Sequence, residues 1–224
     1  MTTHNGHRQR LKQRVAEEGL DGFSDIQALE LLLFYCIPRR DTNPIAHDLL
    51  DRFGSFAQVL EAPPEELQKV PGVGASAAGF LHTVLEAGRY YQVSRVKDIR
   101  VLRTLDECGE FLVPYFHGRT VETVFLLCMD AKCKVLCCKQ VGEGGINSTG
   151  VSLRKLVETA LGARASQVVL SHNHPSGLAI PSEEDIATTR RAAAALKAVE
   201  IQLTDHVIVA EDDYVSLRQS GLQF

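Results

Sequence analysis

The sequence predicts two regions of different fold class, an all-α region over residues 1–95 and an α/β domain with a mixed sheet over residues 104–224. In the first region, apolar residues recur at helical spacing behind serine and proline residues that are typical of helix starts. In the second region, short apolar runs of strand length alternate with helical segments, as they do in α/β domains. Residues 96–103 are predicted to link the two regions, and a chain of 224 residues is long enough for two small domains.

The composition is that of an ordinary globular protein, with 45% apolar and 23% charged residues. Lys and Arg number 24 against 28 Asp and Glu, so the chain lacks the overall basic excess of a dedicated nucleic-acid-binding protein. The N-terminus has no apolar core like that of a secretory peptide, and the longest apolar run, ALELLLFYCIP, is too short to span a bilayer. We therefore expect a cytoplasmic protein without a membrane segment, whose six cysteines stay reduced.

Three helices are predicted before residue 70 from their start and stop signals. The first lies within residues 21–38, with Ser24 as its N-cap. The second has Pro44 in its first turn and is broken at Gly54, and a short third helix begins at Pro63.

The segment VPGVG at residues 70–74 precedes an apolar segment, residues 75–92, that is long enough for another helix. A helix, a tight Gly-x-Gly turn and a second helix form a helix-hairpin-helix unit. Gly72 and Gly74 would let the backbone turn sharply and present N–H groups to a phosphate at a helix N-terminus. A plain connection between two helices has the same features, so DNA contact at these glycines is one of two interpretations.

A basic segment follows at residues 93–103, where weak periodicity favours a linker. This segment and residues 8–14, RQRLKQR, are the two stretches in which basic residues are concentrated. A solvated surface explains both.

The α/β domain is predicted from nine segments of alternating character. In chain order they are a helix at 104–116 capped by Thr104, strands at 121–130 and 133–142, an extended piece at 145–150, a helix at 152–164 capped by Ser152, a strand at 166–172, a helix at 182–200 capped by Ser182, and strands at 201–211 and 213–219.

A candidate metal site lies between the last predicted helix and the strand before it. His172 and His174 follow one another at the end of this strand and share one face, since side chains alternate along a strand. Asp185 lies one turn inside the helix that begins after Ser182. Two imidazoles and one carboxylate suit zinc with an open fourth position. A polar histidine or a helix-dipole acid would explain each residue alone, but their combination favours a metal.

The motif His172-Asn173-His174-Pro175, followed after seven residues by Ser182 and then by Asp185, is similar to the JAMM signature of the JAB/MPN metallo-isopeptidases. The wider pattern resembles the bacterial RadC family over nearly the whole chain. It includes SHNHPSG, PSEED, the Asp205-His206 pair in LTDHVIV and the upstream helix-hairpin-helix.

This resemblance implies a JAB/MPN-type fold and a zinc ion held by His172, His174 and Asp185. It also implies an upstream glutamate as general base, for which Glu122 matches best, while Glu143 and Glu158 remain competitors. The alternative for Glu122 is a surface position at a strand edge.

The implied activity is zinc-dependent hydrolysis of an amide or isopeptide bond in an unnamed peptide substrate. Zinc lowers the pKa of its bound water from about 15.7 toward about 7, and Glu122 would transfer the proton to the leaving amine. Ser182 would donate to the oxyanion or would only cap its helix. Asp205 and His206 would orient a ligand or form a buried polar pair.

Three alternatives remain open. Four cysteines, Cys128, Cys133, Cys137 and Cys138, offer a rival metal site, but their spacing fits no zinc ribbon, and buried thiols explain them better. A DNA-binding protein associated with repair is the second function, although Ala77 replaces the lysine usual in the family's hairpin and removes a phosphate-binding charge. A scaffold that holds zinc without catalysis is the third.

Overall fold

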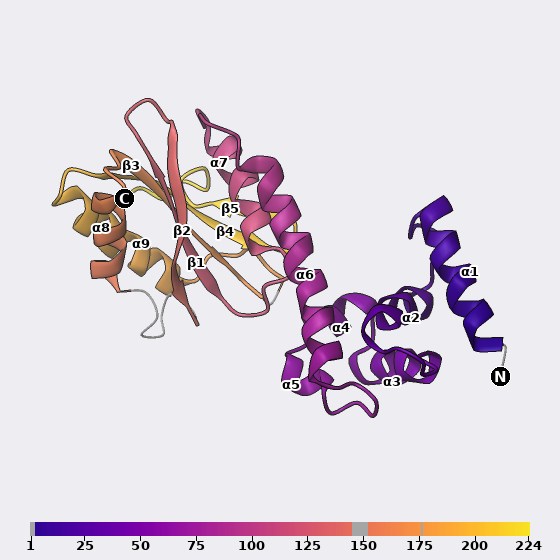
Figure 1. Cartoon of the computed structure of the whole chain (residues 1–224). Coiled ribbons are helices and arrows are strands. Elements are labelled where there is room, and N and C mark those ends of the chain that lie inside the picture. Colours follow the sequence, from indigo (N-terminus) through magenta and orange to yellow (C-terminus); the bar gives the residue numbers. More distant parts are fainter. Residues whose placement is uncertain (1–2, 145–151, 176) are drawn as a thin grey trace. The chain divides into compact units, whose positions relative to one another are not determined.

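The computed structural model describes residues 3–144, 152–175 and 177–224 (Figure 1). It divides into a helical unit, Met1–Gly88, and an α/β unit, Arg89–Phe224. The division falls inside one helix, α6 (Ala75–Val96), and the predicted domain boundaries at residues 95 and 104 stay predictions. In the described part of the chain, no helix combines the length and apolar character needed to cross a membrane.

The helical unit contains α1 (Thr3–Glu18), α2 (Asp25–Cys36), α3 (Asn43–Phe53), α4 (Phe56–Glu61), α5 (Pro64–Leu67) and most of α6. The predictions of α2, α3, α5 and α6 are confirmed, and Ser24 caps α2 by accepting a hydrogen bond from the Gln27 N–H. Sequence analysis missed α1, whose sequence is largely polar, and α4, which is too short to show a helical period. Its start is marked by Ser55, whose side chain accepts from the Gln58 N–H.

The predicted hairpin between α5 and α6 is present. Gly72 has a φ of 93°, in the left-handed region that glycine adopts without strain, and the Gly74 carbonyl accepts from the Ala78 N–H where α6 begins. Ala77 is buried in the core of the helical unit, so the position where the family has a lysine faces the interior in this chain.

The prediction of a linker over residues 93–103 is wrong for its first residues, because α6 continues to Val96. No helix breaker interrupts this stretch, and Val96 packs against the core of the α/β unit. Farther along, Val101 forms an isolated β-bridge with Lys134, and the Leu102 N–H donates to the Cys133 carbonyl. The end of the predicted linker is therefore attached to the sheet.

The α/β unit confirms the predicted mixed sheet with helices. Its elements are α7 (Leu105–Leu112), the 3-10 helix η1 (Val113–Phe116), β1 (Thr123–Met129), β2 (Val135–Glu143), α8 (Leu153–Gly162), β3 (Gln167–Asn173), α9 (Glu183–Lys197), β4 (Gln202–Ala210) and β5 (Asp213–Ser216). The strand order is β2-β1-β3-β4-β5, and β3 and β4 are parallel while the other neighbours are antiparallel. The extended piece predicted at residues 145–150 lies outside the described residues.

Helices cover both faces of the sheet, with α8 and α9 on one side and α7 on the other (Figure 1). Strand β3 lies in the middle, so its residues are buried whichever face they point to. Val168 and Leu170 pack in the core beneath α8 and α9, whereas Val169 packs in the core beneath α7. This alternation directs the next even-numbered residue, His172, toward the layer that contains α9.

Candidate metal centre

His172, His174 and Asp185 come together as predicted, and we call them the His–His–Asp cluster. The two Nε2 atoms of the histidines lie 2.9 Å apart. His172 Nε2 is 3.2 Å from Asp185 Oδ1, and His174 Nε2 is 3.5 Å from Asp185 Oδ2. Three atoms of the kind that ligate a metal therefore face one another at the end of β3 and the start of α9.

The start of α9 positions the carboxylate of the cluster. Ser182 and Asp185 form a capping box, in which the Asp185 N–H donates to Ser182 Oγ at 3.1 Å. In return, the backbone N–H and the hydroxyl of Ser182 both donate to Asp185 Oδ2, at 2.8 and 2.6 Å. One local motif therefore begins the helix and holds the third ligand.

Asp185 is 2% exposed. Burial alone would raise its pKa, but the hydrogen bonds from the hydroxyl and the backbone N–H of Ser182 stabilise the ionised carboxylate and hold the pKa below its usual range. The carboxylate is therefore ionised at neutral pH and available to a cation.

Hydrogen bonds on the far side of each histidine ring determine which nitrogen is free. His174 Nδ1 lies 2.9 Å from the Leu178 carbonyl, which can only accept, so the ring proton is on Nδ1 and the Nε2 lone pair faces the cluster. His172 Nδ1 lies 2.9 Å from His206 Nε2. The two Nε2 atoms and the Asp185 carboxylate thus face one another, as the ligands of one metal ion would.

Asp205 and His206, which were predicted to orient a ligand or to form a buried polar pair, have different roles. His206 is completely buried and contacts His172. Its pKa is well below the ordinary value because burial disfavours the charged ring, and the neighbouring His172 adds to this effect. Asp205 points to the opposite face of the sheet, where it accepts from Ser216 Oγ at 2.5 Å and from the Arg218 N–H at 3.1 Å. His206 belongs to the site, and Asp205 supports the connection after β5.

Comparison with protein families matches residues 102–222 to the RadC-like JAB domain. The match covers more than half of the chain and includes every residue of the cluster. This chain belongs to the RadC-like JAB domain family. The resemblance inferred from the His-x-His motif is thereby confirmed, as is the fold that it implied. In this JAB domain the three residues of the cluster could hold a metal ion.

Glu122, the predicted general base of the JAB domain, is half-buried and immediately precedes β1. Val124 of β1 pairs with His172 of β3 in antiparallel register. This pairing places the segment that precedes β1, which contains Glu122, next to the end of β3 that carries the histidines. The competing glutamates have partners elsewhere: Glu158 pairs with Arg154 on α8, and Glu143 accepts from Gln140 on β2.

Asn173, which sequence analysis left without a role, holds the segment around Glu122. Its Oδ1 accepts from the Thr123 N–H at 2.7 Å, and its Nδ2 donates to the Val121 carbonyl at 3.3 Å. These two backbone groups belong to the peptide bonds on either side of Glu122. The residue between the two histidines therefore determines the backbone position of the candidate base.

Sequence analysis also missed Thr189, which is fully buried and contacts His206 at 2.6 Å. A signal for it exists, since Thr189 follows Asp185 by four residues and so shares its face of α9. Nothing comparable points to the Leu178 carbonyl, because any residue offers the same backbone atom.

The cysteines of the JAB domain do not form a rival metal site among the described residues, where the His–His–Asp cluster is the one group of three or more potential ligands. Burial raises the pKa values of Cys108 and Cys128 to about 12, so both are neutral thiols at physiological pH. Thiolates are the form that binds zinc. Of the four cysteines predicted to be buried apolar residues, Cys128 is buried, whereas Cys133, Cys137 and Cys138 are half-buried.

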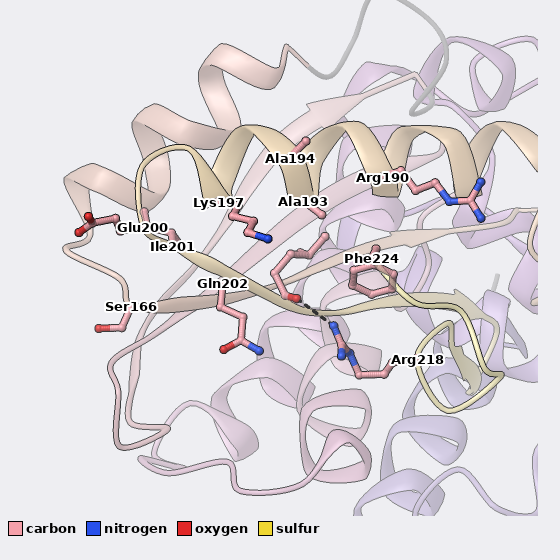
Figure 2. Close-up of a pocket in the computed structure, with 11 residues that line it drawn as sticks. Ser166, Arg190, Ala193, Ala194, Lys197, Glu200, Ile201, Gln202, Arg218 and Phe224 are labelled. Carbon is pink, nitrogen blue, oxygen red and sulfur yellow. Dashed lines mark hydrogen bonds between the residues drawn. The ribbon is translucent and has the colours of Figure 1, made fainter.

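A cavity of about 660 Å³ lies beside the C-terminal half of α9 (Figure 2). Its charged lining consists of Arg190, Lys197, Glu200 and Arg218, and Arg218 donates to the Leu203 carbonyl at 3.3 Å. None of the residues predicted as site residues lines it. The His–His–Asp cluster is therefore outside this cavity.

Replacing Ser182 with alanine is expected to lower the free energy of unfolding by about 1 kcal/mol, because the capping box is lost. Ser152→Ala is the matched control, since Ser152 is the N-cap of α8 but makes no side-chain cap hydrogen bond among the described residues. Urea unfolding of the full chain without added metal measures both. Equal effects of the two substitutions would show that the capping box does not stabilise α9.

Proposed function

We propose that the JAB domain binds one zinc ion through the His–His–Asp cluster and hydrolyses an amide or isopeptide bond in a peptide substrate. The observation that carries this proposal is the convergence of two imidazole Nε2 atoms and a carboxylate within 3.5 Å of one another. A cluster of two nitrogen ligands and one oxygen ligand with an open fourth position is typical of catalytic zinc. The side chain of His174 is 19% exposed, whereas those of His172 and Asp185 are 0% and 3% exposed, so a substrate would approach on the His174 side.

Zinc, when bound, would supply a Lewis acid and an activated water at neutral pH. Glu122 would accept a proton from the attacking water and deliver it to the leaving amine. Asn173 would support this role by holding the peptide groups on both sides of Glu122. Ser182 holds Asp185 through its hydroxyl, and donation to an oxyanion would require that hydroxyl to turn away from the carboxylate.

Purified wild-type protein is expected to contain about one zinc per chain, as in other sites of this ligand type. His172→Ala and Asp185→Ala should each lose the metal, because two ligands hold zinc far more weakly than three. Plasma mass spectrometry measures the metal content, and circular dichroism shows whether each variant is folded. A folded wild-type protein that takes up no zinc, even when zinc is supplied, would contradict the proposal.

Glu122→Gln is expected to retain zinc and to lose at least 100-fold in the rate of amide hydrolysis, the smallest contribution usual for a general base. Glu158→Gln is the control, because Glu158 is an exposed residue paired with Arg154. Both are assayed on a panel of peptides and lysine-linked isopeptides beside the wild type. Undiminished hydrolysis by Glu122→Gln would remove Glu122 as the base. A zinc-loaded wild type inert on the whole panel would instead favour the non-catalytic scaffold.

DNA binding by the helical unit is the second candidate function. The observation that favours it is the Arg40 guanidinium, which lies beside Gly72 and supplies a cation at the hairpin. Backbone N–H groups at a helix start and a nearby guanidinium are suited to a phosphate.

Arg40→Gln is therefore expected to weaken binding of duplex DNA and to reduce the slope of log affinity against log salt by about 1. Lys139→Gln, which removes an exposed cation from β2, serves as the control. Fluorescence anisotropy over a series of salt concentrations measures both. The absence of wild-type binding at low salt would exclude this function.

A further inference from the structure

The geometry points to a positioning role for His206 and Thr189: we propose that they form a buried relay that directs the lone pair of His172 Nε2 toward the metal and so determines zinc affinity. The relay runs from His172 through His206 and Thr189 to the backbone of Asp185. This inference rests on the zinc site proposed above. It adds two residues that act on a ligand without touching the metal.

The direction of the relay is set at Thr189. Its hydroxyl lies 2.6 Å from the Asp185 carbonyl and 2.6 Å from His206 Nδ1. A carbonyl oxygen can only accept, and the hydroxyl has one proton, so Thr189 donates that proton to Asp185. The hydroxyl lone pair is then the acceptor for a proton on His206 Nδ1. The opposite assignment would leave two oxygen atoms 2.6 Å apart without a proton between them.

The remaining protons follow from this step. His206 is completely buried, where a neutral ring with a single proton is favoured, and Thr189 holds that proton on Nδ1. The bare Nε2 of His206 can therefore only accept, and the partner 2.9 Å away is His172 Nδ1. His172 must carry its proton on Nδ1, and its Nε2 lone pair is left facing His174 and Asp185.

The relay also determines where the ligands stand. It joins three elements, β3 through His172, β4 through His206 and α9 through Thr189. Because Thr189 donates to the carbonyl of Asp185 itself, the two ends of the relay are two of the ligands. A ligand histidine more commonly donates to a carboxylate or a carbonyl, and loss of such a partner costs about 10-fold to 100-fold in metal affinity.

Thr189→Val tests the relay with little change in volume, since it removes the hydroxyl and leaves His206 Nδ1 without its acceptor. We expect zinc affinity to fall about 10-fold or more, while Thr189→Ser, which retains the hydroxyl, should stay within about threefold of the wild type. Thr159→Val is the matched control. Thr159 Oγ1 donates to the Lys155 carbonyl at 2.7 Å in the same manner, but on the exposed face of α8.

Zinc affinity of the full chain is measured by competition with a chromophoric chelator. The tautomer of His172 is read separately, from long-range ¹H–¹⁵N correlation spectra of the metal-free protein. In the wild type we expect the Nδ1–H form, and in Thr189→Val a mixture of tautomers. Affinity and tautomer both unchanged in Thr189→Val would overturn the inference. An Nε2–H form of His172 in the wild type would overturn it as well.

A second pair of variants covers the case in which Thr189→Val fails to fold. His206→Gln retains one acceptor and one donor, so it should keep more of the zinc affinity than His206→Leu, which has neither. Equal affinities of these two variants would contradict the relay. A wild type that binds no zinc would refute the proposed function, while the spectra of the metal-free protein would still decide the direction of the relay.

Discussion

The complete burial of His172 is the constraint on which the site depends. A buried imidazole needs a partner for each of its ring nitrogens, because an unsatisfied polar atom in the interior costs about 1–3 kcal/mol. His206 from the adjacent parallel strand meets one nitrogen, and the other faces His174 and Asp185. His172 is buried because β3 lies in the middle of the sheet, and its ring nitrogens find their partners on α9 and β4.

The hydrogen-bond partners around the cluster determine which ring nitrogen of each ligand histidine carries the proton. A backbone carbonyl holds the proton of His174, and the Asp185 carbonyl determines the proton of His172 through Thr189 and His206. The Nε2 lone pairs of both histidines therefore face the Asp185 carboxylate, because the carbonyl groups at the other end of each hydrogen-bond chain can only accept a proton. This arrangement is preorganised for a cation, because the side chains of the cluster have little conformational freedom to lose when the cation binds.

The tripeptide His172-Asn173-His174, at the C-terminal end of β3, contacts two neighbouring segments at once. Its histidines face the layer of α9, while the amide of Asn173 bonds to the backbone before β1 on both sides of Glu122. A strand makes this possible because neighbouring side chains leave it in different directions. A displacement of β3 would therefore move two ligands and the segment of the candidate base together.

Much of the site is encoded in local spacing, which sequence analysis can interpret. The His-x-His pair at a strand end and the Ser182 capping box depend on contacts within a few residues, and the structure brings together the cluster that they predict. The helices with clear caps and the strands of the mixed sheet were predicted for the same reason. The polar helix α1, the short helix α4 and the continuation of α6 were missed, because none of them shows a clear apolar period.

The sequence by itself therefore determined the ligand types, their spacing and the class of fold, since these follow from chain geometry. Which member of the Asp205-His206 pair reaches the cluster was decided by the tertiary structure. The pairing of β3 with β4 shifts by one residue between Val168 and Val169, so that His206 pairs with Leu170 and Asp205 points to the other face. A shift of one residue exchanges the two faces of a strand, and contacts between residues 34 apart in the chain depend on it.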